Sequence, residues 1–213
     1  MTRSHARRRW IVVSIAAAVV AVAVVIQRAA APPRRAPDFA GPAPRILDDG
    51  YISTTHSIDI AAPPAETRDL LSDPNLSLED VIDFDGGFPP VESTEPLIGS
   101  WDPGHREGDR RRVRFADGHY LAEQVITDDP AHFRYVIWGL TSPQRFVVRH
   151  GVAEFRYEAR GDGTRLGWTY SLLPTTPLLA PALRWFVDGT MTPMMRATLD
   201  GMRAHVEGTI SSR

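Results

Sequence analysis

The sequence predicts an α+β fold in which a curved antiparallel sheet of about seven strands wraps a long C-terminal helix. Two observations lead to this fold. From Glu92 onward apolar residues alternate with a period of two, and turn residues separate the runs. Residues 177–206 instead place their apolar side chains at helical spacing. Each element has one apolar face, and packing these faces on each other buries both.

The composition is that of a globular protein with one ordinary domain and an appendage. The chain has 213 residues, of which 43% are hydrophobic and 23% are charged. All 24 basic residues are Arg, and there is no Cys. These absences exclude Schiff-base chemistry, a P-loop lysine, a thiolate nucleophile, a thiolate metal site and a disulfide framework.

Charge is divided unevenly along the chain. Seven of the 24 Arg and none of the 26 acidic residues lie in residues 1–35, so the remainder carries a net charge of about −9. An acidic domain suits nucleic acid poorly, and we expect no nucleic-acid partner. The local exception is Arg110, Arg111, Arg112 and Arg114. We interpret it as a solvated edge strand whose charge opposes aggregation, in preference to a polyanion site.

Residues 1–27 predict a basic flank and one transmembrane anchor. Residues 10–26 are an apolar run broken only by Ser14. As a helix, at about 1.5 Å per residue, the run reaches about 25 Å, which spans a bilayer with help from snorkelling Arg and an interfacial Trp. The alternatives are a signal peptide cleaved after residues 29–31 and, more weakly, a twin-arginine export signal. The Arg distribution favours an extracytoplasmic C-terminal domain.

The next segment, residues 28–50, predicts an extended linker. Its many Pro residues, mixed with Ala and Arg, cannot bury a core, so we expect a tether. The globular domain then covers residues 51–208, and residues 209–213 form a tail.

The domain begins with a strand over residues 51–60, where apolar and polar residues alternate. Pro63 and Pro64 favour the start of a short helix that Pro74 ends. A second short helix is expected between Ser77, as its cap, and Phe84. Six strands follow, over residues 93–99, 109–115, 119–127, 132–139, 146–159 and 164–173.

One face of this sheet collects large apolar side chains and needs a cover. Met195, Leu199 and Met202 supply it from the last helix, in which Gly189 and Pro193 predict a kink or a break. Four of the five Met residues lie in this segment, and their flexible thioethers suit either a core or an adaptable pocket. The apolar face of the sheet consists of Val113, Phe115, Leu121, Val125, Phe155, Tyr157, Leu166, Trp168, Tyr170 and Leu172.

Together these features resemble the START-like or Bet v 1-like (SRPBCC) helix-grip superfamily, and within it the polyketide cyclase/dehydrase-like branch. The resemblance covers most of the domain and excludes the N-terminal segment. It lies in the order of short motifs: Ile58-Asp59-Ile60-Ala61-Ala62-Pro63-Pro64, Gly108-Asp109-Arg110-Arg111-Arg112-Val113, Asp117-Gly118, Glu123, Asp129-Pro130, Tyr135, and Gly163-Thr164-Arg165-Leu166-Gly167-Trp168.

The resemblance implies a cavity between the sheet and the long helix that accepts an apolar small molecule or a lipid. Members of this fold serve as carriers, sensors, cyclases and hydroxylase-associated domains, so the fold does not select the function. We predict a membrane-anchored, non-catalytic domain that binds a hydrophobic ligand or lipid. One alternative is a polyketide cyclase/dehydrase-type enzyme acting on an apolar or aromatic substrate. A second is a structural or interaction module whose cavity is filled.

The expected polar site lies on the apolar face. If the hairpin turns at Asp117, Arg111 and Glu123 lie opposite each other and form an ion pair, with Tyr135 in the same group. In an enzyme, Glu123 or Tyr135 would act as acid or base and Arg111 as an electrostatic stabiliser. A one-residue slip of the register would instead turn Glu123 outward to a surface arginine, or the pair would be structural.

No cofactor and no metal are expected, because the chain lacks Cys and any close pair of His residues. His119, His132 and His150 lie on strands, where single His residues are usually solvated or hydrogen-bonded. The residues expected to contact the ligand are Phe115, Glu123, Tyr135, Phe155, Tyr157, Trp168, Tyr170, Met195 and Met202.

Overall fold

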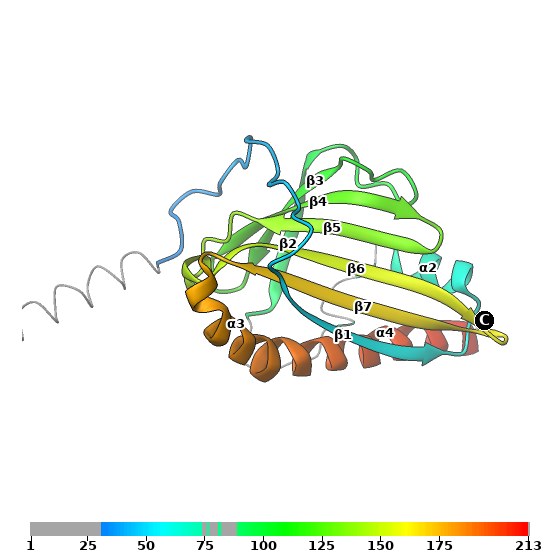
Figure 1. Cartoon of the computed structure of the whole chain (residues 1–213). Coiled ribbons are helices and arrows are strands. Elements are labelled where there is room, and N and C mark those ends of the chain that lie inside the picture. The colour runs from blue at the N-terminus through cyan, green and yellow to red at the C-terminus, as the bar shows by residue number, and fades with distance from the viewer. Residues whose placement is uncertain (1–30, 74–75, 77–80, 82–88, 213) are drawn as a thin grey trace, which may run out of the picture.

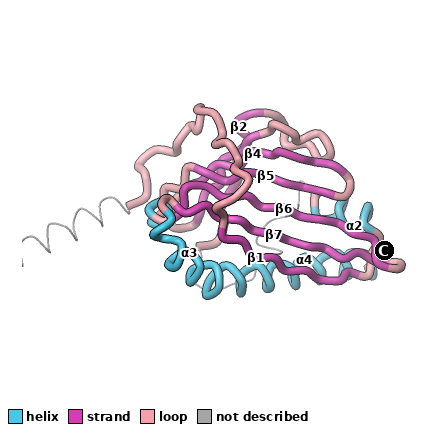
Figure 2. The backbone as a smooth tube through the Cα atoms, viewed as in Figure 1, coloured by secondary structure: helices cyan, strands magenta, loops and turns pink. Residues whose placement is uncertain are grey.

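The computed structural model describes residues 31–73, 76, 81 and 89–212. A seven-stranded antiparallel sheet packs against a long C-terminal helix, which confirms the predicted fold (Figures 1 and 2). The strand order, β1-β7-β6-β5-β4-β3-β2, follows from consecutive hairpins, with the first strand closing against the last. The strands are β1 (Ile52–Ile60), β2 (Val91–Ile98), β3 (Arg110–Phe115), β4 (Tyr120–Asp129), β5 (His132–Trp138), β6 (Val148–Arg160) and β7 (Gly163–Pro174).

The observed strands agree with the predicted ones to within two residues at each end. The turn residues explain this agreement. Gly118 and Gly161 adopt positive φ angles of 81° and 60° in their hairpins, a conformation that glycine reaches without a steric cost. Turns fixed at these points set where each strand begins and ends.

The short helix α2 (Pro64–Leu71) begins at the predicted proline pair, and the amide of Thr67 donates to the Pro63 carbonyl over 2.9 Å. Its C-terminal leucines pack against the core. The second predicted helix, at residues 77–84, lies outside the described residues apart from Val81.

The C-terminal segment consists of η3 (Pro177–Leu179), α3 (Ala180–Phe186), a π-helical turn η4 (Val187–Met191) and α4 (Thr192–Ser211). The predicted interruption is therefore present: Gly189 lies in the π turn, and Pro193 occupies the first turn of α4, where its missing N–H costs nothing. The helix continues beyond the expected end at residue 206. Thr209 and Ser211 bond carbonyls four residues back and so remain within the helix.

The interpretation of the arginine run as a solvated edge strand is wrong. The strand at this edge of the sheet is β2, and β3 lies between β2 and β4. Alternation still divides the side chains between the two faces of the sheet: Arg111 points to the concave face that α4 covers, and Arg110 to the convex face. Arg110 is buried there, where it stacks on Trp138 and bonds Gln124 over 2.7 Å.

The predicted tether is also not free over its described part. Residues 31–50, called the strap below, cross the convex face of the sheet before entering β1 (Figure 1). Arg110 Nη1 donates to the carbonyls of Phe39 and Gly41 over 2.5 and 2.8 Å, and Arg112 Nη1 donates to the Pro37 carbonyl over 2.6 Å. A proline-rich segment thus satisfies its carbonyls with arginine side chains in place of a β-ladder.

The strap ends over a buried histidine. Tyr51 OH lies 2.7 Å from His150 Nε2 and accepts a hydrogen bond from the Leu47 amide. His150 is 2% exposed, and its burial, followed by the charge of Arg149, lowers its pKa. The last part of the strap therefore covers a neutral imidazole on the convex face.

No helix in the described part of the chain is long and apolar enough to cross a membrane. The predicted span at residues 10–26 lies outside that part, so the membrane anchor and its orientation stay predictions. The predicted domain boundaries do so as well.

Candidate functional site

The concave face of the sheet is built from side chains that alternate inward along each strand. Cross-strand pairing aligns them in rows, one of which runs from Arg111 through Glu123 and Ile137 to Gly151 and Leu172. Most of this face is apolar, and α4 covers it. The rows place a few polar groups inside an otherwise apolar layer, and these groups form the candidate site.

Arg111 and Glu123 pair directly across β3 and β4, as the turn at Asp117 predicted. Arg111 Nε donates to Glu123 Oε2 over 2.6 Å, and the two side chains are only 18% and 11% exposed. The alternative register, with Glu123 turned outward, is excluded. The site therefore holds a largely desolvated ion pair, in which a charge-assisted hydrogen bond fixes both groups.

The Trp101 ring packs against the guanidinium group of Arg111. Arg111 Cζ lies 4.2 Å from the centre of the Trp101 ring, within cation–π range. Trp101 has a φ of 59°, unusual for a bulky residue, and its amide donates to Asp109 Oδ2 over 2.7 Å. Such a conformation costs about 1–3 kcal/mol and persists only where neighbouring contacts enforce it. The Asp109 carboxylate supplies such a contact, which no pattern in the sequence predicted.

Two phenols adjoin the ion pair, of which Tyr135 is buried and Tyr170 is partly buried. Tyr135 lies diagonally across from Glu123, and Tyr170 lies two strands further along the sheet from Tyr135. Burial raises the pKa of Tyr135 well above its ordinary value, and the Glu123 carboxylate raises it further. Burial and Glu123 likewise raise the pKa of Tyr170. Both phenols are protonated at neutral pH and can donate hydrogen bonds.

The remaining residues expected to contact a ligand lie in or against the hydrophobic core. Phe155 stacks on Trp168 with ring centres 5.0 Å apart, and Trp168 Nε1 is buried without a hydrogen-bond partner among the described residues. Burial raises the pKa of Tyr157 to about 12. Phe115, Phe155, Tyr157, Trp168 and Met195 belong to the buried cluster, against which Tyr170 and Met202 are partly buried.

A second polar group, not predicted from the sequence, links β1 to α4. His56 Nε2 lies 3.2 Å from Thr54 Oγ1 and 3.3 Å from Thr192 Oγ1, and Arg196 Nε approaches His56 Nδ1 at 3.5 Å. Burial, followed by the charge of Arg196, lowers the pKa of His56. The imidazole is neutral at neutral pH and lies where the π turn leads into α4.

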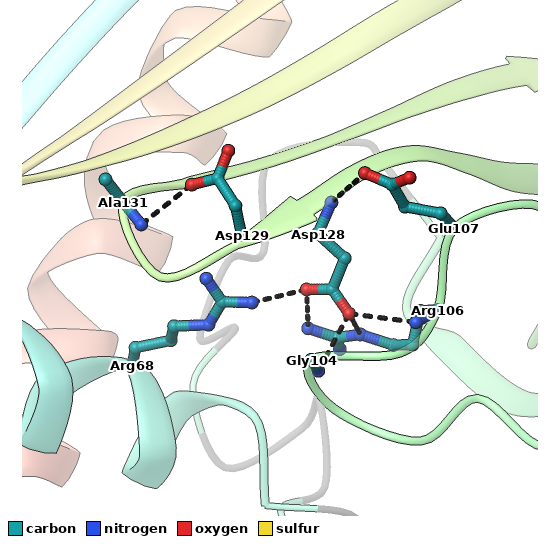
Figure 3. A network of polar contacts seen from close by, with 7 residues as sticks. All are labelled: Arg68, Gly104, Arg106, Glu107, Asp128, Asp129 and Ala131. Atoms are coloured by element: carbon teal, nitrogen blue, oxygen red, sulfur yellow. Dashed lines mark hydrogen bonds and ion pairs between the residues drawn. The ribbon is translucent and has the colours of Figure 1, made fainter.

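The most extensive polar network lies at the opposite end of the sheet, around Asp128 (Figure 3). Its carboxylate is fully buried and pairs with Arg68 of α2 and with Arg106, whose Nε lies 2.9 Å from Oδ2. The Gly104 amide also donates to it over 2.8 Å. Burial raises the pKa of Asp128, but the hydrogen bonds and charges of Arg106 and then Arg68 lower it more.

This network is a structural clamp that fixes α2 and the loop before β3 to the end of β4. The sequence pattern gives no sign of the clamp, because Asp128 stands in Asp128-Asp129-Pro130, a run of turn residues between two predicted strands. A β-bulge between Val125 and Thr127 shifts the register just before Asp128. The alternation of apolar and polar residues in the sequence does not predict this bulge.

Two hollows on the outside of the domain do not coincide with the predicted cavity. The first, of about 450 Å³, lies between the strap and the convex face and is lined partly by Tyr51, Arg134 and Glu154. The second, of about 320 Å³, lies between β1 and α4 beside His56 and Arg196. On the concave side the predicted lining residues pack against one another. Within the described ranges, no group of three or more His, Asp or Glu residues could hold a metal ion.

Comparisons with known proteins agree with this architecture. The sequence model of a family described as "Polyketide cyclase / dehydrase and lipid transport" matches residues 51–207. The Zhui aromatase/cyclase from Streptomyces sp. R1128 superimposes with a TM-score of 0.55 at 18% identity, over 75% of this chain and 96% of that one. Norcoclaurine synthase from Thalictrum flavum gives 0.54 at 16%, over 76% and 98%.

A protein from Thermus thermophilus gives a TM-score of 0.54 at 20% identity, over 74% of this chain and 99% of that one. No curated protein matches the sequence. At these identities the structural likeness shows the fold, and the activities of these proteins do not transfer with it.

Proposed function

Because the chain belongs to the polyketide cyclase/dehydrase and lipid transport family, we propose that its domain binds an apolar or aromatic small molecule, or a lipid, between the sheet and α4. The binding is non-catalytic, and residues 10–26 hold the domain at a membrane, on the extracytoplasmic side. The ligand carries at least one polar atom, because the apolar layer of the concave face contains the polar groups of Arg111, Glu123, Tyr135 and Tyr170.

One observation carries the proposal: the Arg111–Glu123 ion pair with the neutral phenols of Tyr135 and Tyr170 inside an apolar layer. Burying charges is costly, so an ion pair at this place is weak evidence for stability and suits a role in orienting a ligand. Arg111 and the phenols are hydrogen-bond donors for a carbonyl, hydroxyl or carboxylate. The unpartnered Trp168 indole adds one more donor.

Because the interior is packed, core side chains must move before a ligand can enter. Met191 of η4 and Met194 and Met195 of α4 are buried in the core, and Met202 of α4 is partly buried against it. Unbranched thioethers change rotamer at low cost, so they can move aside for a ligand and refill the space when it leaves. The occupied and empty domains then differ mainly in these side chains.

The test compares ligand retention in the full chain and in two variants. Wild type is purified from its source cells in a mild detergent, and bound small molecules are identified by native mass spectrometry. Arg111→Gln/Glu123→Gln removes the interior pair, while Asp59→Asn/Arg160→Gln removes an exposed pair of similar geometry, 2.7 Å long. We expect a stoichiometric adduct in wild type and in the surface variant, and reduced retention in the interior variant.

An empty wild-type domain that stays empty after incubation with membrane lipid extract would contradict the proposal. That outcome would favour the structural module with a filled core, which the packing of the predicted lining residues also fits.

A second candidate, a cyclase or dehydrase-type enzyme, is favoured by the proximity of the Glu123 carboxylate to the Tyr135 phenol and Arg111. A carboxylate that accepts a proton beside a phenol that donates one can perform general acid–base catalysis. In that case Glu123→Gln abolishes turnover of the retained compound while its retention persists. Unchanged turnover in Glu123→Gln would exclude it.

A further inference from the structure

The segment that leads from β7 into α4 carries apolar residues on two opposite sides. Leu183 and Val187 are buried against the core, as a helix on a sheet requires. The outer side should be polar, yet it carries exposed apolar residues at positions i, i+3, i+4 and i+7: Leu178, Pro181, Ala182 and Trp185. Leu178 is 88% and Trp185 78% exposed. A helix with two apolar sides belongs between two apolar environments.

Phe146 extends this surface. It lies at the end of η2 (Pro143–Phe146), is 49% exposed, and its carbonyl accepts a hydrogen bond from Thr175 Oγ1 over 2.9 Å, just before η3. We call Phe146, Leu178 and Trp185 the apolar tip. Exposed large apolar side chains gathered at one place mark an interaction site, whereas scattered ones need no explanation.

The charge around the tip is opposite to that of the rest of the domain. Residues 139–153 and 172–187, which build this end, contain no Asp or Glu, and Arg149 and Arg184 are exposed there; the next acidic residue, Asp188, lies in the π turn. The chain after residue 35 carries a net charge of about −9. A local basic surface with an aromatic tip suits an anionic bilayer, because Trp prefers the interface and Arg binds lipid headgroups.

The strap begins at the same end of the domain. Pro32, at the start of the strap, lies against Gly118 in the β3–β4 turn. That turn adjoins η2, because His119 Nδ1 lies 3.1 Å from Thr141 Oγ1. Figure 1 shows the start of the strap on the same side of the molecule as α3. The described part of the chain, which follows the predicted anchor, therefore begins close to the apolar tip.

We propose that the apolar tip docks on the surface of an anionic lipid bilayer, with Trp185 and Leu178 in the interfacial region and Arg149 and Arg184 at the headgroups. This inference rests on the proposed membrane anchor and deepens it, since the anchor holds the tip near the bilayer and docking orients the domain. In the Arg111–Glu123 row, Ile137 lies one residue before the end of β5 and Leu172 lies two residues before the end of β7, where both strands reach this end of the sheet. A docked domain thus presents its ligand site toward the lipid.

The experiment uses the full chain, whose lack of Cys allows one label at a chosen position. Trp185→Cys and Leu178→Cys carry a nitroxide at the tip, and Asp162→Cys carries it in the β6–β7 turn at the other end. Each is reconstituted in vesicles of phosphatidylcholine alone or mixed with phosphatidylglycerol. We expect the tip labels to become accessible to oxygen in the lipid and protected from an aqueous nickel relaxant, most strongly in the anionic vesicles. The label at 162 stays in water.

Arg149→Gln and Arg184→Gln, introduced into the labelled Trp185→Cys chain, each lower the ratio of docked to undocked domain about fivefold in anionic vesicles. A tip label as water-accessible as the label at 162 would overturn the proposal. So would spin–spin broadening that grows with the protein-to-lipid ratio, which indicates a second copy on the tip. Protection independent of lipid charge, and present in detergent, would also overturn it and indicate that residues 1–30 cover the tip. Carbonate extraction of the vesicles tests the proposed membrane anchor independently of the tip, because an anchored chain stays with the membrane whether or not the tip docks.

Discussion

The Arg111–Glu123 pair shows how a costly feature can persist inside an apolar face. Each ion loses hydration when it is buried, and the loss is offset only when the geometry is good and neighbouring groups help. Here a 2.6 Å charge-assisted bond and the Trp101 ring 4.2 Å away provide both. The net contribution of the intact pair to the free energy of unfolding is therefore small. Removal of one partner costs more than that contribution, because the other charge stays buried without a counter-ion.

We therefore expect Glu123→Gln to lower the free energy of unfolding by about 2–4 kcal/mol, because it leaves the Arg111 guanidinium largely buried without a counter-charge. Adding Arg111→Gln should recover much of this loss. Urea unfolding of the two single variants and the double variant gives the coupling energy from a double-mutant cycle. Additive effects of the two substitutions would show that the pair is not coupled, contrary to the geometry.

The location of this pair was predictable, whereas that of the Asp128 clamp was not. Asp117-Gly118 fixes a tight hairpin, and a hairpin with a known turn determines every opposing pair, including Arg111 with Glu123. Asp128 follows a β-bulge that changes the face of the sheet to which its side chain points. Its partners Arg68 and Arg106 come from a helix and a loop. No local pattern links residues that only the assembled domain brings together.

For the strap, too, one property could be predicted from the sequence and another could not. Its proline-rich composition correctly indicates the absence of helix and strand, but composition carries no information on docking. Docking depends on Arg110 and Arg112, whose guanidinium groups reach strap carbonyls. It also depends on Gly139, where a Cβ atom would lie 2.4 Å from Phe39 Cε1. The absence of a side chain at 139 makes room for the Phe39 ring.

Gly139→Ala should accordingly release the strap. Gly161→Ala is the matched control, because both glycines have similar positive φ angles, 67° and 60°, but no atom lies within 4 Å of a Cβ at 161. Both substitutions cost about 1–2 kcal/mol for the left-handed backbone. Only Gly139→Ala should speed cleavage after Arg35 and Arg45 in limited trypsin digestion followed by mass spectrometry. Equal cleavage rates in the two variants would show that Phe39 does not hold the strap.

The stability of the domain should fall in mild acid, because buried imidazoles must take up protons. Burial lowers the pKa of His150 and of His56 below 6.5 in the folded state, so the unfolded chain binds protons first as the pH falls. Their stabilising contribution is complete above about pH 6.5 and is lost as the pH falls through the lowered pKa values. Denaturant unfolding measured across this range should show the decrease.

His150→Gln should flatten part of this dependence, because it removes one of the two buried imidazoles. At more acid pH, Asp128 adds a second loss: its pKa is held below 3.8, so its stabilising contribution is present above that value and disappears below it. A stability profile that is flat from neutral pH down to 3.8 would contradict the burial of both imidazoles.

The sheet order has a consequence for how the chain comes to be folded. β1 finds its partner only in β7: Ile60 pairs with Thr164 and Ile52 with Leu172. During synthesis, at ~5–20 residues per second, the first strand emerges on the order of ten seconds before the last one. Throughout that interval β1 lacks its partner strand, so the sheet cannot close. The domain therefore completes its fold only after β7 has been synthesised.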